Sequence, residues 1–260
     1  MIIDAVIANK TLFGGGVFVG LFIAERVFAA AAAPEGLARL LRNGALWLLL
    51  MLLSPLIVLP LTAFAAEHPL WTREGAMSGG AALLVDVVIL DLWTYWLHRA
   101  YHEIGPMRRF HRIHHLDEHL DTTSAVRFHP GEVAISATLR MAPIILLAIP
   151  FSHVVFFETA LLAASLFHHS NVRLTAGIER ALSRVIVTPS IHWVHHHRTP
   201  ADTNSNYAAI FSLWDPIFGT RSATPRTPGM EIGLAGVADE SAIGLLLAPF
   251  QPNDRQSGLR

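Results

Sequence analysis

Histidines at helical spacings are the residues of this chain best suited to chemistry. Ten of the fifteen histidines fall into four groups, namely His98 and His102, His111 with His114 and His115, His168 with His169, and His192 with His195 and His196. Positions i, i+3 and i+4 of an α-helix share one face, so each group would present its imidazoles side by side. Neutral imidazole is the commonest protein metal ligand and suits iron, zinc, copper and nickel. The spacing therefore predicts a metal site.

The number of imidazoles indicates more than one ion. Three helical groups supply eight of them, and the group at residues 168–169 adds another, which is too many for one metal. They suffice for two five-coordinate or six-coordinate ions with positions left open, and an open position distinguishes a catalytic site from a structural one. The HExxH motif of zinc proteases is absent from the sequence.

The composition indicates a membrane protein. The chain is 52% hydrophobic and 15% charged, with a mean hydropathy of +0.44, whereas roughly 25% of the residues of a soluble domain are charged. A formal net charge of −1 gives no basic field for nucleic acid. The absence of cysteine excludes disulfides, zinc fingers, thiolate-bound iron–sulfur clusters and a catalytic thiol.

Long apolar segments must position the histidines. Residues 12–33, 44–66 and 79–97 are each long enough for a membrane-spanning helix. Residues 133–167, broken by Pro143 and Pro150, are predicted to form a tilted or partly inserted helical hairpin with its tip near His153. We therefore predict an all-α integral membrane bundle of three spans plus a hairpin, with a histidine-rich helical cap that binds metal.

Arginines in the short loops predict the orientation of the bundle. Arg39 and Arg42 precede the second span and five arginines follow the third, whereas the intervening loop has only Arg73. Positive loops stay in the cytoplasm, so all the histidine groups are predicted on the cytoplasmic side. The predicted domains are N-terminal spans at residues 1–75, a catalytic domain at 76–220 that includes the third span and the hairpin, and a tail at 221–260.

Several polar residues have two interpretations each. Asp91 lies two turns before His98, where it would orient that imidazole or bond to a neighbouring span. Asn206 is either a donor beside the site or a turn residue. His197 is expected to be exposed or next to the ligands, whereas His68, His119 and His153 are expected to have no ligand role.

The histidine motifs resemble those of the fatty acid hydroxylase superfamily, which includes the sterol desaturases. The resemblance rests on His98-x-x-x-His102, on the two HxxHH motifs, on Arg127-Phe128-His129-Pro130, and on residues 167–174 and 214–220. These motifs occur in the family's order and cover residues 80–220. The first two spans and the tail carry no family-specific motif.

The resemblance implies an oxidoreductase of lipid biosynthesis, a membrane-bound di-iron monooxygenase that hydroxylates or desaturates a lipid such as a sterol or a fatty acyl chain. It implies two iron ions, with dioxygen as co-substrate. Because an aliphatic C–H bond has no acidic proton for a base to remove, we assign no general base. Some members have a further histidine where this chain has Ser165, and His168 or His129 is the candidate to replace it. The ligands implied by motif are His98, His102, His111, His114, His115, His169, His192, His195 and His196.

Electrons must come from a second protein, because the chain has no flavin or NAD fingerprint and no cysteine for an iron–sulfur cluster. A ferredoxin or a b-type cytochrome with its reductase is expected. The lipid substrate is expected to enter sideways from the bilayer. Two alternatives stay open, a membrane metal transporter or metal-binding protein without catalysis, and a haem-binding bundle with paired axial histidines.

Overall fold

The computed structural model describes residues 9–73 and 78–251, which form helices joined by loops with four isolated β-bridges and no strand. The all-helical prediction is confirmed. The predicted domain boundary at residues 75–76 and the last residues of the predicted tail, 252–260, lie outside this part of the chain.

The helices are α2 (Lys10–Val27), α3 (Ala38–Glu67), α4 (Gly79–Glu103), α5 (Gly105–His115), α6 (Pro130–Leu147), α7 (Phe151–His169), α8 (Ala176–Leu182), α9 (Pro189–His195), α10 (Pro200–Thr203), α11 (Trp214–Phe218) and α12 (Ala242–Leu247), with 3₁₀ turns η1 (Ser124–Val126) and η2 (Ala248–Phe250).

Four helices are long and apolar enough to cross a membrane, namely α3, α4, α6 and α7. The hairpin predicted as tilted or partly inserted is formed by α6 and α7, whose arms have 18 and 19 residues. Between the arms Ala148 has a left-handed φ of 51° and Pro150 caps α7, so the chain reverses within a few residues. Each arm therefore has the length of a full span.

The predicted first span differs most from expectation. Helix α2 ends at Val27 and carries three charged residues within its 18, so it is absent from the four helices above. One of the three, Glu25, is buried and accepts hydrogen bonds from the backbone N–H groups of Thr122 and Asn171. The end of α2 is thus tied to the segments that follow the histidine-bearing helices α5 and α7.

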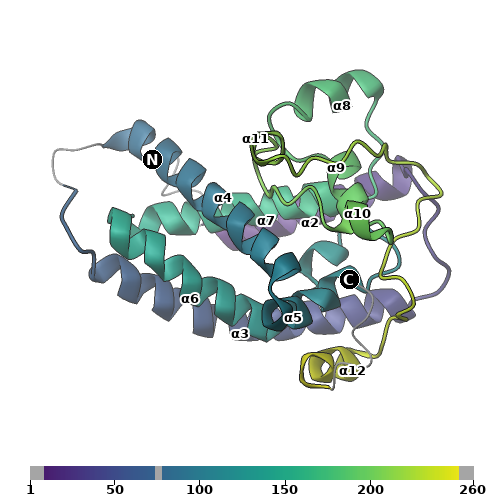
Figure 1. The fold of residues 1–260 in the computed structure, drawn as a ribbon, viewed down its shortest axis with the longest axis horizontal. Helices are drawn as coiled ribbons and strands as arrows, with labels where there is room; N and C mark the ends of the chain where they lie inside the picture. The colour runs from purple at the N-terminus through teal and green to yellow at the C-terminus, as the bar shows by residue number, and fades with distance from the viewer. Residues whose placement is uncertain (1–8, 74–77, 252–260) are drawn as a thin grey trace.

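The long helices pack around an apolar core, and the shorter helices gather toward one end of them (Figure 1). Leu90 of α4, Ile144 of α6 and Phe157 of α7 are buried together in that core. Helix α3 lies along α6 and stays helical through Pro55 and Pro60. We call the end that carries α5 and α9 the cap.

Asp91 joins the cap to the bundle. Its carboxylate accepts hydrogen bonds from the backbone N–H groups of Ile210 and Phe211, at 3.0 Å each, and from the indole N–H of Trp214 at 2.8 Å. Asp91 is fully buried, and Nδ1 of His98 bonds to the backbone oxygen of Tyr207 instead. Of its two interpretations, the bond to a neighbouring segment holds, and it fixes the 210–214 loop against α4.

The opposite end of α4 is held by a second buried acid. Both oxygens of Asp86 accept hydrogen bonds from Arg73 at 2.6 Å, and Oδ2 also lies 2.7 Å from Nδ1 of His153 in the first turn of α7. Asp86 is fully buried. His153 therefore serves to fasten α7 to α4, in agreement with its expected non-ligand role.

Candidate metal centre

Eight of the nine histidines implied by motif lie on four helices that meet at the cap, and the ninth, His196, directly follows the last residue of α9. His98 and His102 occupy the last two turns of α4, and His169 is the last residue of α7. The chain leaves α4 at Ile104, which is extended, and Gly105-Pro106 begins α5. Pro189 begins α9 in the same way. The backbone N–H at the first position of a helix has no partner within the helix, so a proline costs no hydrogen bond there. Both short helices thus start just before their HxxHH motifs.

The structure divides these nine residues into two clusters. Within each, one nitrogen from every ring lies within 4.8 Å of those from the others. The five-histidine cluster comprises His98, His102, His111, His115 and His195, and the four-histidine cluster comprises His114, His169, His192 and His196.

Each HxxHH motif contributes to both clusters. In α5, His111 and His115 belong to the five-histidine cluster and His114 to the four-histidine cluster. In α9 the division is reversed, because His192 and His196 join the four-histidine cluster. The i and i+4 rings face one centre and the i+3 ring faces the other, so α5 and α9 lie between two centres and share them.

The spacing of the ring nitrogens fits metal coordination. In the four-histidine cluster Nε2 of His169 lies 3.0 Å from Nε2 of His114 and 2.9 Å from that of His192. In the five-histidine cluster the Nε2 atoms of His111 and His115 are 3.2 Å apart. Two imidazoles on one ion, with bonds of about 2.1 Å, have nitrogens about 3.0 Å apart at right angles and about 3.4 Å apart at tetrahedral angles.

The rings are suited to bind metal as neutral imidazoles. Burial lowers the pKa of the cap histidines well below the ordinary histidine value, and neighbouring imidazoles lower it further. Only the unprotonated nitrogen coordinates a metal ion, so this environment favours the ligand form. These histidines are His114, His115, His192, His195 and His196.

Hydrogen bonds on the far side of several rings aim the other nitrogen inward. In the five-histidine cluster, Nδ1–H of His98 donates to the backbone oxygen of Tyr207 (2.8 Å), and that of His195 donates to the oxygen of Ser205 (2.6 Å). Nδ1 of His111 lies 2.7 Å from Oε1 of Glu132. Such bonds fix the tautomer and the orientation of a ligand imidazole.

The four-histidine cluster has similar supports from the backbone. Nδ1–H of His114 donates to the oxygen of Arg127 (3.2 Å), and that of His169 donates to the oxygen of Ser165 (2.8 Å). Neither Glu132 nor these carbonyl groups were identified from the sequence. Glu132 had a signal, an acid at the start of an apolar helix next to the His129-Pro130 motif, whereas the carbonyl groups had none.

Several nitrogens in the clusters are buried and have no hydrogen-bond partner. They include Nε2 of His98, Nε2 of His195 and both ring nitrogens of His102. Leaving a buried polar atom unpaired costs about 1–3 kcal/mol. A metal ion within the five-histidine cluster would give a partner to Nε2 of His98, to Nε2 of His195 and to one nitrogen of His102, so the residues present fit a metal group.

The two candidates to replace the missing histidine lie outside both clusters. His129 caps α6, and both its ring nitrogens are occupied, because Nδ1 accepts from the Gly131 N–H (2.8 Å) and Nε2–H donates to the oxygen of Leu246 (3.1 Å). His168 is buried with its ring centroid 4.1 Å from that of His192. Ser165 itself lies behind His169, with Oγ 3.3 Å from its Nδ1.

The remaining predicted polar residues are structural. Asn206 has a left-handed φ of 52°, and its side chain donates to the oxygen of Ile191 and accepts from the Ser222 N–H. It is a turn residue that holds α9. His197 bonds to Asp202, and His68 is exposed at the end of α3.

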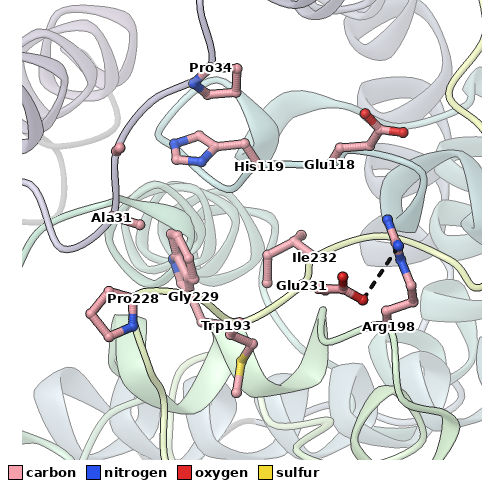
Figure 2. Close-up of a pocket in the computed structure, with 12 residues that line it drawn as sticks. Ala31, Pro34, Glu118, His119, Trp193, Arg198, Pro228, Gly229, Glu231 and Ile232 are labelled. Carbon is pink, nitrogen blue, oxygen red and sulfur yellow. Dashed lines mark hydrogen bonds and ion pairs between the residues drawn. The ribbon is translucent and has the colours of Figure 1, made fainter.

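A cavity of about 400 Å³ lies beside α9 and is separate from the clusters. Figure 2 shows Trp193, His119 and Ile232 around it, together with the ion pair between Arg198 and Glu231. None of the clustered histidines lines this cavity. Trp193, between His192 and His195 in sequence, therefore faces away from the metal centre.

Comparison with known proteins identifies the family. A family model described as fatty acid hydroxylase matches residues 83–220, more than half of the chain. The chain belongs to the fatty acid hydroxylase family. The matched segment contains all nine clustered histidines, and the resemblance inferred from their motifs is confirmed.

Curated relatives of this family member act on lipids. The ornithine lipid hydroxylase OlsE of Rhizobium tropici is 28% identical over 174 residues, which cover 67% of this chain and 52% of the relative. Alkylglycerol monooxygenase is 33% identical over 131 residues in Danio rerio and 31% identical over 134 residues in Homo sapiens, covering 50% and 52% of this chain. The chain spans about half of the first relative's length and 28% and 29% of the other two. No solved structure matches it.

Proposed function

We propose that this protein is a membrane-bound di-iron oxygenase that hydroxylates a lipid. The observation that carries the proposal is the pair of histidine clusters, one of five imidazoles and one of four, inside the segment that matches the fatty acid hydroxylase model. Nitrogen-rich ligation suits iron, and dioxygen chemistry needs a redox-active metal, which zinc is not. Each proposed ion keeps open positions, because neither cluster reaches six ligands.

The nine clustered histidines would hold the metal pair, which when bound supplies the activation of dioxygen. Hydroxylation converts a C–H bond to C–OH with one oxygen atom, and the other leaves as water with two electrons and two protons. No group of the chain has to remove a proton from the substrate carbon. The protein's tasks are to hold the imidazoles, to bind the lipid and to exclude bulk water. Burial of eight of the nine rings serves the last task.

The substrate is proposed to be a lipid whose fatty acyl chain, alkyl chain or sterol body lies among the spans. Hydroxylation is favoured over desaturation because the relatives are named as a hydroxylase and as monooxygenases. The clusters lie at the ends of α4 and α7, two of the helices long and apolar enough to span, and the lipid is proposed to enter sideways from the bilayer. The arginine distribution supports a cytoplasmic cap. The electron donor is proposed to be a ferredoxin or a b-type cytochrome with its reductase.

Metal analysis and a labelling assay test the proposal. The full chain is purified in detergent, its iron content is measured, and it is supplied with a reducing system, isotopically labelled dioxygen and a lipid. An ornithine lipid and an alkylglycerol are the first substrates to test, because the relatives carry those names. We expect two non-haem irons per chain and one labelled oxygen atom in the product.

Three results would contradict the proposal. Activity in protein that contains no iron would rule out a di-iron centre, and a Soret band in the optical spectrum would indicate haem instead. Metal that is bound and transported across vesicles, without oxidation of any lipid, would favour the transporter alternative.

A further inference from the structure

The C-terminal apolar segment, residues 242–250, has two distinct sides. It comprises α12 and η2, and no residue in it has a polar side chain. Ile243, Leu247 and Phe250, at positions i, i+4 and i+7, are 72%, 55% and 68% exposed. Leu245 and Pro249 lie on the other side and are buried. One side thus packs on the protein while a stripe of three large apolar side chains faces outward.

The buried side places this segment beside the membrane. Leu245 packs against Leu46 of α3 and Ile113 of α5. Leu46 lies about two turns into α3, which is long and apolar enough to span. Leu41 and Leu48 of α3 are also exposed. Figure 1 shows α12 outside the bundle at the cap end. The exposed stripe therefore neighbours the lipid-facing surface of α3 where that helix leaves the cap.

We propose that the C-terminal apolar segment is an interfacial membrane anchor whose Ile243, Leu247 and Phe250 insert into the lipid surface. Short helices with one apolar side bind at the boundary of headgroups and acyl chains, and aromatic residues are favoured there. A second copy of the chain is a poorer occupant, because a stable protein interface buries about 800 Å² per partner from 20–30 residues. The outward stripe offers only three side chains, too few for such an interface. If α3 spans the membrane, lipid covers the face of α3 that adjoins the stripe.

The same segment holds the loop that supports the metal centre. The oxygen of Leu246 accepts the hydrogen bond from His129, and Asp239, just before the segment, pairs with both terminal nitrogens of Arg127. The backbone oxygen of Arg127 supports His114. The anchor therefore ties the membrane surface to the loop between α5 and α6.

Single-cysteine labelling tests the anchor without metal or turnover, because the chain contains no cysteine. The full chain carrying Ile243→Cys is labelled with an environment-sensitive fluorophore and placed in phospholipid nanodiscs. Leu56→Cys, at an exposed position within α3, is the buried-in-lipid control, and Thr199→Cys, exposed at the start of α10, is the aqueous control. We expect a blue-shifted label at position 243, quenched by nitroxide on shallow acyl carbons and at least about fivefold slower to quench with iodide than the label at 199.

The outcome is decided by comparison of the three positions. A label at 243 that behaves like the one at 199 overturns the proposal. The proposal is also overturned if the label at 243 is protected from iodide, is unaffected by lipid nitroxide and shows energy transfer between copies of the chain. That combination indicates a protein interface. Leu247→Cys and Phe250→Cys repeat the measurement should the first variant fold poorly. Loss of the proposed enzymatic function would leave these results unchanged, so the two proposals fail separately.

Discussion

The two histidine clusters differ in what holds their imidazoles. In the five-histidine cluster the carboxylate of Glu132 supports His111, alongside two backbone oxygens that support other rings. In the four-histidine cluster the supports are the backbone oxygens of Arg127 and Ser165. A carboxylate can be deleted by mutation, whereas a carbonyl group moves only when its backbone moves. The first cluster should therefore be sensitive to one side chain and the second to whatever fixes the loop around Arg127.

That loop is fixed by charge. Arg127 is fully buried, and its guanidinium donates to Asn43 of α3, to the oxygen of Ile113 and to Asp239. Asp239 also pairs with Arg42 at 2.5 Å. The position of the carbonyl group behind His114 thus depends on residues from α3 and from the C-terminal part of the chain.

The largest effects are expected from the ligands themselves. His195→Ala removes a ring from the five-histidine cluster and His114→Ala removes one from the four-histidine cluster. We predict loss of activity below detection in both, and iron falling from two per chain to one or none, while circular dichroism retains the helical signal. His68→Ala is the matched control, because its ring is exposed and bonded only within α3. An unchanged iron content in either variant would show that the substituted histidine is not a metal ligand.

Asp239→Asn tests the support of the four-histidine cluster. It breaks the ion pair of the buried Arg127 guanidinium, and breaking a buried ion pair by removing one partner typically costs about 3–5 kcal/mol. We predict that the thermal midpoint in detergent falls on the order of 10 °C and that the iron of this cluster is lost first. Glu231→Gln, which alters one exposed 3.5 Å ion pair, should change neither. Equal iron loss from both clusters would show that Asp239 stabilises the cap generally.

Glu132→Ala tests the support of the five-histidine cluster. Loss of a carboxylate behind a metal-binding histidine typically costs 10- to 100-fold in metal affinity or activity, and we predict roughly that loss here. Glu132→Gln keeps an oxygen acceptor and should be milder. Iron titration of the stripped protein measures the effect, with the exposed Glu118→Gln as control. An alanine variant with normal iron affinity would reduce Glu132 to a packing residue.

The contrast between the clusters also shows how far the sequence could be interpreted. The apolar segments predicted the bundle, because a membrane imposes a length on its helices, and the histidine spacing predicted nine residues that the structure brings together. Their division between two centres was not predictable from spacing. Helix geometry sets the i+3 ring of each HxxHH motif about 60° from the i ring and about 100° from the i+4 ring, but which centre a ring joins depends on the imidazoles that the other helices present there.

Other features depended on contacts between distant segments. The carboxylate of Asp91 had two equally good interpretations until the 210–214 loop was placed against it. Helix α2 ends at Val27, six residues before the predicted end, and its buried Glu25 accepts hydrogen bonds from Thr122 and Asn171 that the sequence could not predict. Backbone carbonyl groups behind His98 and His114 have no sequence signal at all, since any residue supplies one.

The smallest effect is expected from Ser165→Ala, at the position where other family members have a histidine. The Nδ1–H of His169 already donates to the backbone oxygen of this residue at 2.8 Å, and the hydroxyl contact is longer, at 3.3 Å. Alanine keeps the carbonyl group and the helix, so we predict a change in activity and iron affinity of less than about threefold. Turnover and iron titration beside wild type would measure it. A tenfold loss would mean that the hydroxyl, and not the carbonyl group, orients His169, and the distinction between a backbone-supported and a carboxylate-supported cluster would no longer hold.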